Sequence, residues 1–346
     1  GNNLDWAQAI TALGLDDVDK VIVRQPSYFE ELDGIIADTP IETWKNYLAF
    51  HVMDTSASLL DETTDTIAFE YRNRILYGQA EQQPRWKRGI QMVNGLLGEA
   101  VGKLYVAEHF PPEAKAKMEE LVQNVIVTLE DSIDELEWMT EETRIKAREK
   151  LSKFTPKIGY PDVWKDYSTL EIVAGDNVGN VRRAREWAYQ QDLDKLGEPV
   201  DKNEWHMNPQ TVNAYYSPTQ NEIVFPAARL QPPFFQLDAD DAINYGAVGG
   251  VIGHEISHGF DDKGSQFDGD GNLSNWWTDE DRAAFEERTK VLVEQFNEFS
   301  PIEGMTINGE LTLGENIGDL SGVAMAYRAY IRSLDGKEPP VIDGFT

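Results

Sequence analysis

Apolar and polar positions alternate along the first two-thirds of the chain mainly with the period of amphipathic helices. In the clearest case, apolar side chains recur at intervals of three and four residues: Met118, Leu121, Val122, Val125, Leu129, Ile133 and Leu136. This spacing places them on one face, which predicts a helix packed against a core. Pro111-Pro112 fits the start of this helix, because proline is tolerated in the first helical turn.

Weaker patterns predict further helices on both sides of this one. Thr140 is followed by Glu141 and Glu142, a combination typical of an N-cap with acidic residues in the first turn. Residues 72–92 and 181–193 are also expected to be helical.

The pattern changes near residues 195–205, where we expect a domain boundary. Residues 212–216 and 222–225 are short runs rich in β-forming side chains, separated by the turn sequence Ser217-Pro218-Thr219-Gln220-Asn221. This arrangement predicts a hairpin. A further helix is expected to begin near Asp240. The chain is therefore predicted to be mainly helical, of the α+β class.

Composition excludes several classes of function. The 346 residues include 31 Lys+Arg and 61 Asp+Glu, a formal net charge of −30, whereas nucleic-acid binding needs a clustered cationic surface. We therefore expect no nucleic-acid partner. The absence of cysteine excludes disulfides, zinc fingers, iron–sulfur sites and thiol nucleophiles. No apolar run approaches the roughly 20 residues of a membrane span, so none is expected in this chain.

His254 and His258 form an H-E-x-x-H motif with Glu255. Four residues advance a helix by about 400°, so the two imidazoles project from one face, about one turn apart. That spacing allows two ring nitrogens to reach one zinc ion at ~2.0–2.1 Å. Glu255 lies between them and can approach a water on the metal without being a ligand. A catalytic zinc needs a third protein ligand and one open position.

A candidate for the third ligand occurs in the sequence Gly314-Glu315-Asn316-Ile317-Gly318-Asp319. Glu315 and Asp319 are four residues apart and hence on one helix face. Glu315 can bind zinc through a carboxylate oxygen, and Asp319 can accept the other ring N–H of a histidine ligand. Asp261, three residues after His258, can do the same for the second histidine. Spacing alone does not decide these pairings.

Each of these residues also has a simpler explanation. The two histidines could be satisfied helix side chains and Glu315 a solvated carboxylate, but their joint occurrence favours the metal site. His206 is expected to be structural or exposed. The sequence Asp268-Gly269-Asp270-Gly271-Asn272 suggests a calcium loop, but Leu273 stands where that loop requires glycine, which favours an acidic surface turn.

Several motifs together resemble the neprilysin-like (M13) family of zinc metallopeptidases. In the second part of the chain, five stretches carry the resemblance: residues 213–217, 223–226, 230–235, 254–262 and 314–319. Earlier stretches fit as well: residues 93–95, 101–106 and 158–161. The similarity thus covers nearly the whole chain and is far more specific than a lone zinc motif. The absence of cysteine suggests a bacterial-type member, because animal relatives rely on disulfides.

The resemblance implies a thermolysin-like zinc peptidase lobe opposite a helical cap lobe, with the active site enclosed between them. Residues 1–110 would form part of the cap lobe, 111–200 connecting helices, and 201–346 the catalytic lobe. Family members extend further at both ends, so the chain is expected to be truncated there. The missing C-terminal part of the catalytic lobe would come from another segment or another chain.

The resemblance also assigns roles to the candidate site residues, as in enzymes that combine H-E-x-x-H with E-x-x-x-D. It implies one zinc ion per chain, with Glu255 as general base on the zinc-bound water. The ligands would be His254, His258 and Glu315. The carboxylates of Asp319 and Asp261 would orient the two imidazoles.

Oligopeptides are the substrates that the resemblance implies. It places Asn213 and Ala214 on an edge strand that binds the substrate backbone by strand addition, and it adds Phe234 and Val251 to the substrate-binding residues. Arg229 stands where the family usually has an aliphatic residue lining the primed-side pocket. We therefore expect Arg229 to shift the preference of that pocket towards acidic or polar side chains.

Two other functions stay open. Family members carry a further histidine that stabilises the oxyanion, whereas this sequence has no histidine after His258. The chain could therefore bind zinc and peptides but cleave them weakly or not at all. An exopeptidase with the same ligands is less favoured, since no G-A-M-E-N-type motif is present. A secreted, periplasmic or cell-envelope location is favoured over a cytoplasmic one.

Overall fold

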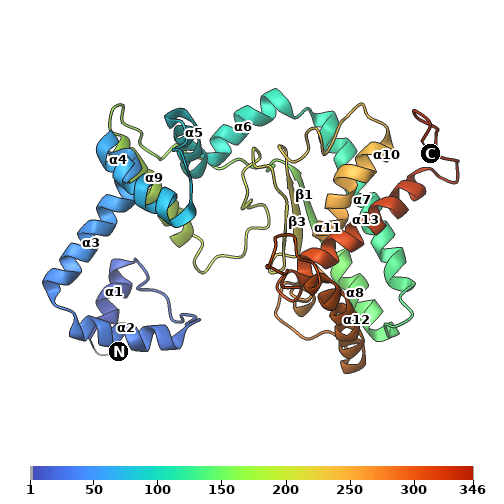
Figure 1. Cartoon of the computed structure of the whole chain (residues 1–346), viewed down its shortest axis with the longest axis horizontal. Helices are drawn as coiled ribbons and strands as arrows, with labels where there is room; N and C mark the ends of the chain where they lie inside the picture. Colours follow the sequence, from blue (N-terminus) through green and yellow to red (C-terminus); the bar gives the residue numbers. More distant parts are fainter. Residues whose placement is uncertain (1–2, 346) are drawn as a thin grey trace. The chain divides into compact units, whose positions relative to one another are not determined.

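The computed structural model describes residues 3–345, which fold mainly into helices with one three-stranded sheet (Figure 1). The α+β, mainly helical class is thus confirmed. The described residues form two compact units, the first from the residues up to Leu97 and Asp166–Asp201, the second from Gly98–Lys165 and the residues from Lys202 onward. The chain passes between the units three times, at residues 97–98, 165–166 and 201–202, whereas a single boundary near residues 195–205 was expected. The lobe roles of residues 1–110, 111–200 and 201–346 stay a prediction.

The first unit is helical. Its helices are α1 (Trp6–Ala12), α2 (Pro26–Asp38), α3 (Ile41–Ser56), η1 (Ala57–Leu59), α4 (Glu62–Phe69), the π-helical η2 (Glu70–Ile75), α5 (Arg85–Leu96) and α9 (Asn177–Leu193). The predicted helix over residues 181–193 is confirmed within α9. The continuous helix over residues 72–92 is wrong, because Gly78 adopts a positive φ of 68° that ends the first segment, and Pro84 precedes the start of α5.

The second unit contains the longest helices. They are α6 (Gly98–His109), α7 (Pro112–Asp134), α8 (Glu141–Ser152), α10 (Asp241–Asn244), the π-helical η3 (Tyr245–Gly249), α11 (Gly250–Ser257), η4 (Gly264–Gln266), α12 (Asp279–Asn297) and α13 (Leu313–Ser333). The predicted helix with one apolar face is α7, which starts at Pro112 but ends before Leu136. Thr140 caps α8 as predicted, accepting a hydrogen bond from the Thr143 N–H, and the helix expected near Asp240 is α10.

The sheet has the strand order β1-β3-β2. Strand β3 (Glu222–Pro226) pairs in parallel with β1 (Thr155–Gly159) and antiparallel with β2 (Tyr215–Ser217). The predicted hairpin is therefore confirmed, but β2 is shorter than expected and begins after Asn213 and Ala214. Strand β1 was not predicted, because it is only five residues long and contains Pro156, a residue uncommon within strands.

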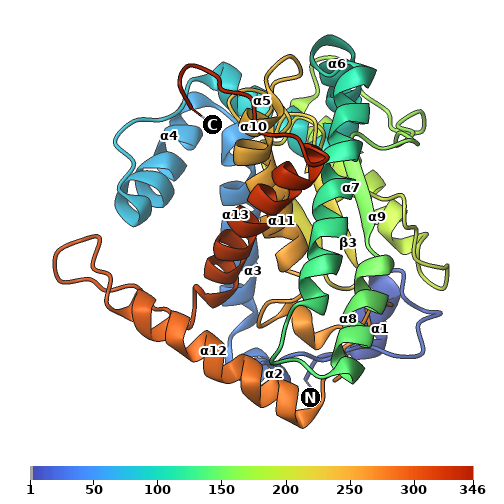
Figure 2. The same ribbon diagram turned by 90° about the vertical axis from the view of Figure 1, so that its right-hand side faces the viewer.

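The core of the second unit lies between α7, the sheet and α11. The apolar face of α7 packs with β3 and α11 through fully or almost fully buried side chains: Met118, Val122, Val125, Ile223, Phe225, Ile252 and Ile256. Figure 2 shows α13 running alongside α11. Within residues 3–345, no helix is both long and apolar enough to cross a bilayer.

Glycines allow α11 and α13 to approach each other closely. A Cβ on Gly253 would lie 2.8 Å from the Gly322 Cα, and a Cβ on Gly322 would lie 2.5 Å from the Gly250 carbonyl oxygen. Both distances are too short for a real side chain, so the two backbones meet directly at these positions. The contact fixes the crossing of the two helices that carry the candidate site residues.

Candidate metal centre

The structure brings His254, His258 and Glu315 together from two helices. His254 lies in α11, His258 is its C-cap, and Glu315 lies in the first turn of α13. The Nε2 atoms of the two histidines are 3.0 Å apart, and the Glu315 Oε2 is 3.4 Å from the His254 Nε2. Among residues 3–345, this is the one cluster of histidine and acidic side chains with metal-ligand geometry, all its ligand atoms lying within 4.8 Å of one another.

A carboxylate faces the other ring nitrogen of each histidine. The His254 Nδ1 is 2.9 Å from the Asp319 Oδ1, and the His258 Nδ1 is 2.8 Å from the Asp261 Oδ2. Because an ionised carboxylate only accepts hydrogen bonds, each Nδ1 carries the hydrogen in the neutral imidazole. Each Nε2 is then an unprotonated lone-pair donor. The two pairings that spacing left undecided are therefore formed.

This donor set fits a zinc ion. Two lone pairs that face each other at 3.0 Å repel unless a cation lies between them, and the Glu315 carboxylate adds a negative charge beside them. Two imidazole nitrogens and one carboxylate oxygen are ligands that zinc accepts, with histidine orientation fixed by outer carboxylates. The Glu315 side chain is 71% exposed, so one side of the cluster is open to solvent.

Glu255 lies in α11 between the two histidines and is buried. Burial raises the pKa of Glu255, with a further rise from Glu315, whereas the charges of His258, His254 and Arg229 oppose the shift. A carboxylate with a raised pKa is suited to take up a proton during a reaction and release it again.

The pKa of His258 is also raised. Burial on its own lowers the pKa of this imidazole, but the hydrogen bond from its ring to Asp261 and the negative charges of Asp261, Glu255 and Glu315 outweigh that effect. The same hydrogen bond that raises the pKa therefore holds the ring in place.

Close packing beside His254 depends on Gly318, which sequence reasoning did not single out. A Cβ at this position would lie 2.8 Å from the His254 Nδ1, so only glycine leaves room for the imidazole next to α13. The signal was present in the sequence, because Gly314, Gly318 and Gly322 recur every four residues on one helix face.

The residues predicted to bind substrate lie in different surroundings. Asn213 is exposed and Ala214 is buried, and both directly precede β2, one of the two edge strands of the sheet. The Arg229 guanidinium stacks 3.8 Å from the centre of the Phe234 ring, and its Nε is buried without a hydrogen-bond partner. Burial lowers the pKa of Arg229, whereas the charge of Glu255 raises it. Val251 is half-buried at the edge of the core.

Comparisons with known proteins identify the family of the chain. Two family models, both described as peptidase family M13, match residues 1–161 and 213–346. Neprilysin-11 of Caenorhabditis elegans is 35% identical over 97% of this chain and 42% of its own length, and endothelin-converting enzyme 1 of Homo sapiens is 36% identical over 91% and 42%. The chain thus spans less than half the length of these curated relatives.

Solved structures show the same fold. The crystal structure of Mycobacterium tuberculosis zinc metalloprotease Zmp1 in complex with an inhibitor matches with a TM-score of 0.92 and 48% identity, over 99% of this chain and 53% of that one. PepO from Lactobacillus rhamnosis matches with a TM-score of 0.75 and 34% identity, over 83% of this chain and 45% of that one. The chain therefore belongs to peptidase family M13.

Proposed function

We propose that the protein is a zinc-dependent endopeptidase that hydrolyses oligopeptides. The observation that carries this proposal is the convergence of the His254 and His258 Nε2 atoms with the Glu315 carboxylate, while a second carboxylate faces each Nδ1 atom. Membership of family M13 supports it, as do the names of similar proteins, which include a zinc metalloprotease and an endothelin-converting enzyme.

In this proposal one zinc ion per chain is held by His254, His258 and Glu315. When bound, zinc supplies a Lewis acid that polarises a peptide carbonyl and lowers the pKa of water. Asp319 and Asp261 keep the two imidazoles in the tautomer that presents Nε2. Glu255 accepts a proton from the attacking water and passes it to the leaving amine. Its burial and raised pKa support that role.

The substrate would bind as an extended chain beside β2. The exposed Asn213 and the neighbouring Ala214 are proposed to contact its backbone, since an edge strand presents unpaired N–H and C=O groups to an added strand. Phe234, Arg229 and Val251 are proposed to contact its side chains. Cleavage would take place outside the cytoplasm.

Removing the metal is expected to abolish cleavage. A peptide blocked at its N-terminus should be cut internally by the purified chain, lose all cleavage with a chelator, and regain it when zinc is added, because the Lewis acid is essential to the step. Mass spectrometry of the products measures this. Zinc and peptide binding without any cleavage would favour a peptide-binding module instead, and trimming of unblocked peptides alone would favour an exopeptidase.

Arg229 is expected to control which side chain follows the cleaved bond. Arg229→Ile should move the preference there from acidic or polar residues to bulky apolar ones, with roughly 10-fold changes in kcat/KM, a typical size for a remodelled apolar pocket. A peptide-library digest measures the preference. Arg282→Ile is the matched control, because Arg282 also stacks on an aromatic ring, that of Trp277. Arg282→Ile should keep the preference of the unmodified chain. If the unmodified chain already preferred bulky apolar residues and Arg229→Ile did not change that preference, this role would be contradicted.

A further inference from the structure

Lys150 is one of the most deeply buried side chains of the second unit, although it carries an ammonium group. It lies in the last turn of α8 and is 1% exposed. Its Nζ donates three hydrogen bonds, to the carbonyl oxygens of Gly259 (2.6 Å), Gly264 (2.7 Å) and Phe267 (2.7 Å). An ammonium has three N–H donors, so all of them are used on one short segment of main chain.

The surroundings of this ammonium are unusual for a buried cation. Among residues 3–345 no carboxylate lies within ion-pair distance of the Nζ. Three aromatic rings surround it instead, those of Tyr216, Phe260 and Trp276, with centres 5.6–5.9 Å away. Burial lowers the pKa of Lys150 to about 8, although the charges of Asp261 and Asp268 oppose the shift. Burying a charge without a counter-charge is costly, so the three carbonyl contacts have to be well formed.

The main-chain segment that Lys150 holds also carries the carboxylate behind His258. Asp261 is 4% exposed, and its Oδ1 accepts hydrogen bonds from the N–H groups of Lys263 (2.8 Å) and Gly264 (2.7 Å). Its Oδ2 faces the His258 Nδ1. Gly264 is thus held on both sides, its carbonyl by Lys150 and its N–H by Asp261.

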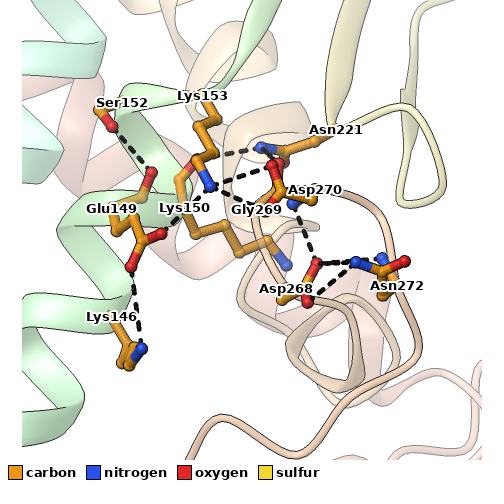
Figure 3. A network of polar contacts seen from close by, with 10 residues as sticks. All are labelled: Lys146, Glu149, Lys150, Ser152, Lys153, Asn221, Asp268, Gly269, Asp270 and Asn272. Atoms are coloured by element: carbon orange, nitrogen blue, oxygen red, sulfur yellow. Dashed lines mark hydrogen bonds and ion pairs between the residues drawn. The ribbon is translucent and has the colours of Figure 1, made fainter.

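The backbone of Lys150 is itself anchored. The Asn221 Nδ2 donates to the carbonyl oxygens of Lys150 (3.0 Å) and Gly269 (3.1 Å), and the Lys153 Nζ pairs with Asp270 at 2.9 Å. Figure 3 shows these residues joining the end of α8 to the 268–272 turn. The backbone from which the Lys150 side chain extends is therefore held in place, so its Nζ can fix the position of the Gly259–Phe267 segment.

We propose that Lys150 is a positioning residue for the zinc site: it holds the Gly259–Phe267 segment so that the Asp261 carboxylate fixes the orientation of the His258 ring. Lys150 touches neither metal nor substrate in this role. The inference rests on the proposed function, since it takes His258 to be a zinc ligand.

The test measures zinc affinity in the folded metal-free chain by competition with a coloured chelator. Lys150→Met keeps the length of the side chain and removes all three donors. It is expected to weaken zinc binding about 10-fold or more, within the range typical when an outer partner of a histidine ligand is lost. The visible spectrum of the cobalt-substituted protein should shift as well, because that spectrum reports the geometry of the ligands.

A double-mutant cycle with Asp261→Asn decides whether the effect passes through Asp261. If it does, the Lys150→Met/Asp261→Asn variant should bind zinc about as weakly as Asp261→Asn alone, since residues that act through one another are not additive. Losses that multiply in the double variant would overturn the proposal, as would a Lys150→Met protein with the zinc affinity and cobalt spectrum of the unmodified chain.

Lys157→Met is the matched control. Lys157 is also buried and bound to a main-chain carbonyl, that of Glu204, but it pairs with Glu222 on the sheet. The substitution of Lys157 should lower stability and leave zinc affinity unchanged. If Lys157→Met lost as much zinc affinity as Lys150→Met, the specific role of Lys150 would be refuted.

Near-ultraviolet circular dichroism shows whether each variant is folded. If Lys150→Met is not, the same cycle is run with Lys150→Gln, which retains two N–H donors and should give a smaller loss that again disappears beside Asp261→Asn. An unmodified chain that does not bind zinc would refute the proposed function. Normal zinc binding in both that chain and the Lys150 variant would refute only the positioning role.

Discussion

Glu255→Gln is expected to abolish peptide cleavage while the protein still binds zinc. Glutamine has nearly the same shape as glutamate, so the neighbouring histidines are not displaced, but its amide cannot accept and return a proton. Loss of a general base lowers rates by roughly 10²–10⁴-fold, and the fall in kcat should be at the upper end because no other described carboxylate lies between the two histidines on α11.

The measurement combines kcat for a blocked peptide with the zinc content of the same preparation. Glu310→Gln serves as the matched control, since Glu310 is an exposed glutamate just before α13 and should leave both quantities unchanged. A Glu255→Gln protein with normal peptidase rates would end the assignment of the base. Loss of zinc together with activity would show that Glu255 mainly supports the metal site.

His254→Ala is expected to remove both zinc and activity. The substitution deletes one of three proposed ligands and leaves the exposed Asp319 carboxylate without the ring that it faces. The loss of zinc affinity should exceed the roughly 10–100-fold that follows loss of an outer partner. Equilibrium dialysis against zinc measures it.

His206→Ala is the matched control for this substitution. His206 is an exposed histidine of the same unit, and its ring lies 3.0 Å from the Gln220 side chain, away from the metal cluster. Its replacement should leave zinc binding and cleavage intact. If His254→Ala bound a full equivalent of zinc with unaltered affinity, the proposed ligand set would have to be abandoned.

The sequence was sufficient to predict the features that are formed by residues close together in the chain. The four-residue spacing of His254 and His258 and the apolar period of α7 both follow from the geometry of a single helix. The pairing of His258 with Asp261 also spans only three residues. Glu315 could be chosen as a candidate, but its approach to the histidines depends on the packing of α13 against α11, which spacing does not encode.

Other features were not predictable because they depend on partners distant in the chain. Strand β1 is defined by pairing with β3 more than sixty residues later, and its own short sequence carries little strand signal. The role of Lys150 could not be predicted from the sequence either. Its three partners are main-chain carbonyls, and every residue carries one. The error over residues 72–92 arose because the helical periodicity of the sequence continues across Gly78, whereas the helical conformation of the backbone ends there.

The direct backbone contact of Gly253 with Gly322 has a consequence for how this site can vary among sequences. Because two crossing helices meet there without intervening side chains, the distance from the histidine pair to Glu315 is set by the crossing itself. The chain from α12 up to the start of α13 can then lengthen, shorten or diverge without disturbing the ligands, whereas the Gly259–Phe267 segment beside His258 cannot. A methyl group added at either glycine would instead push the two helices apart. It would thereby separate the histidine pair from Glu315, although the change is small.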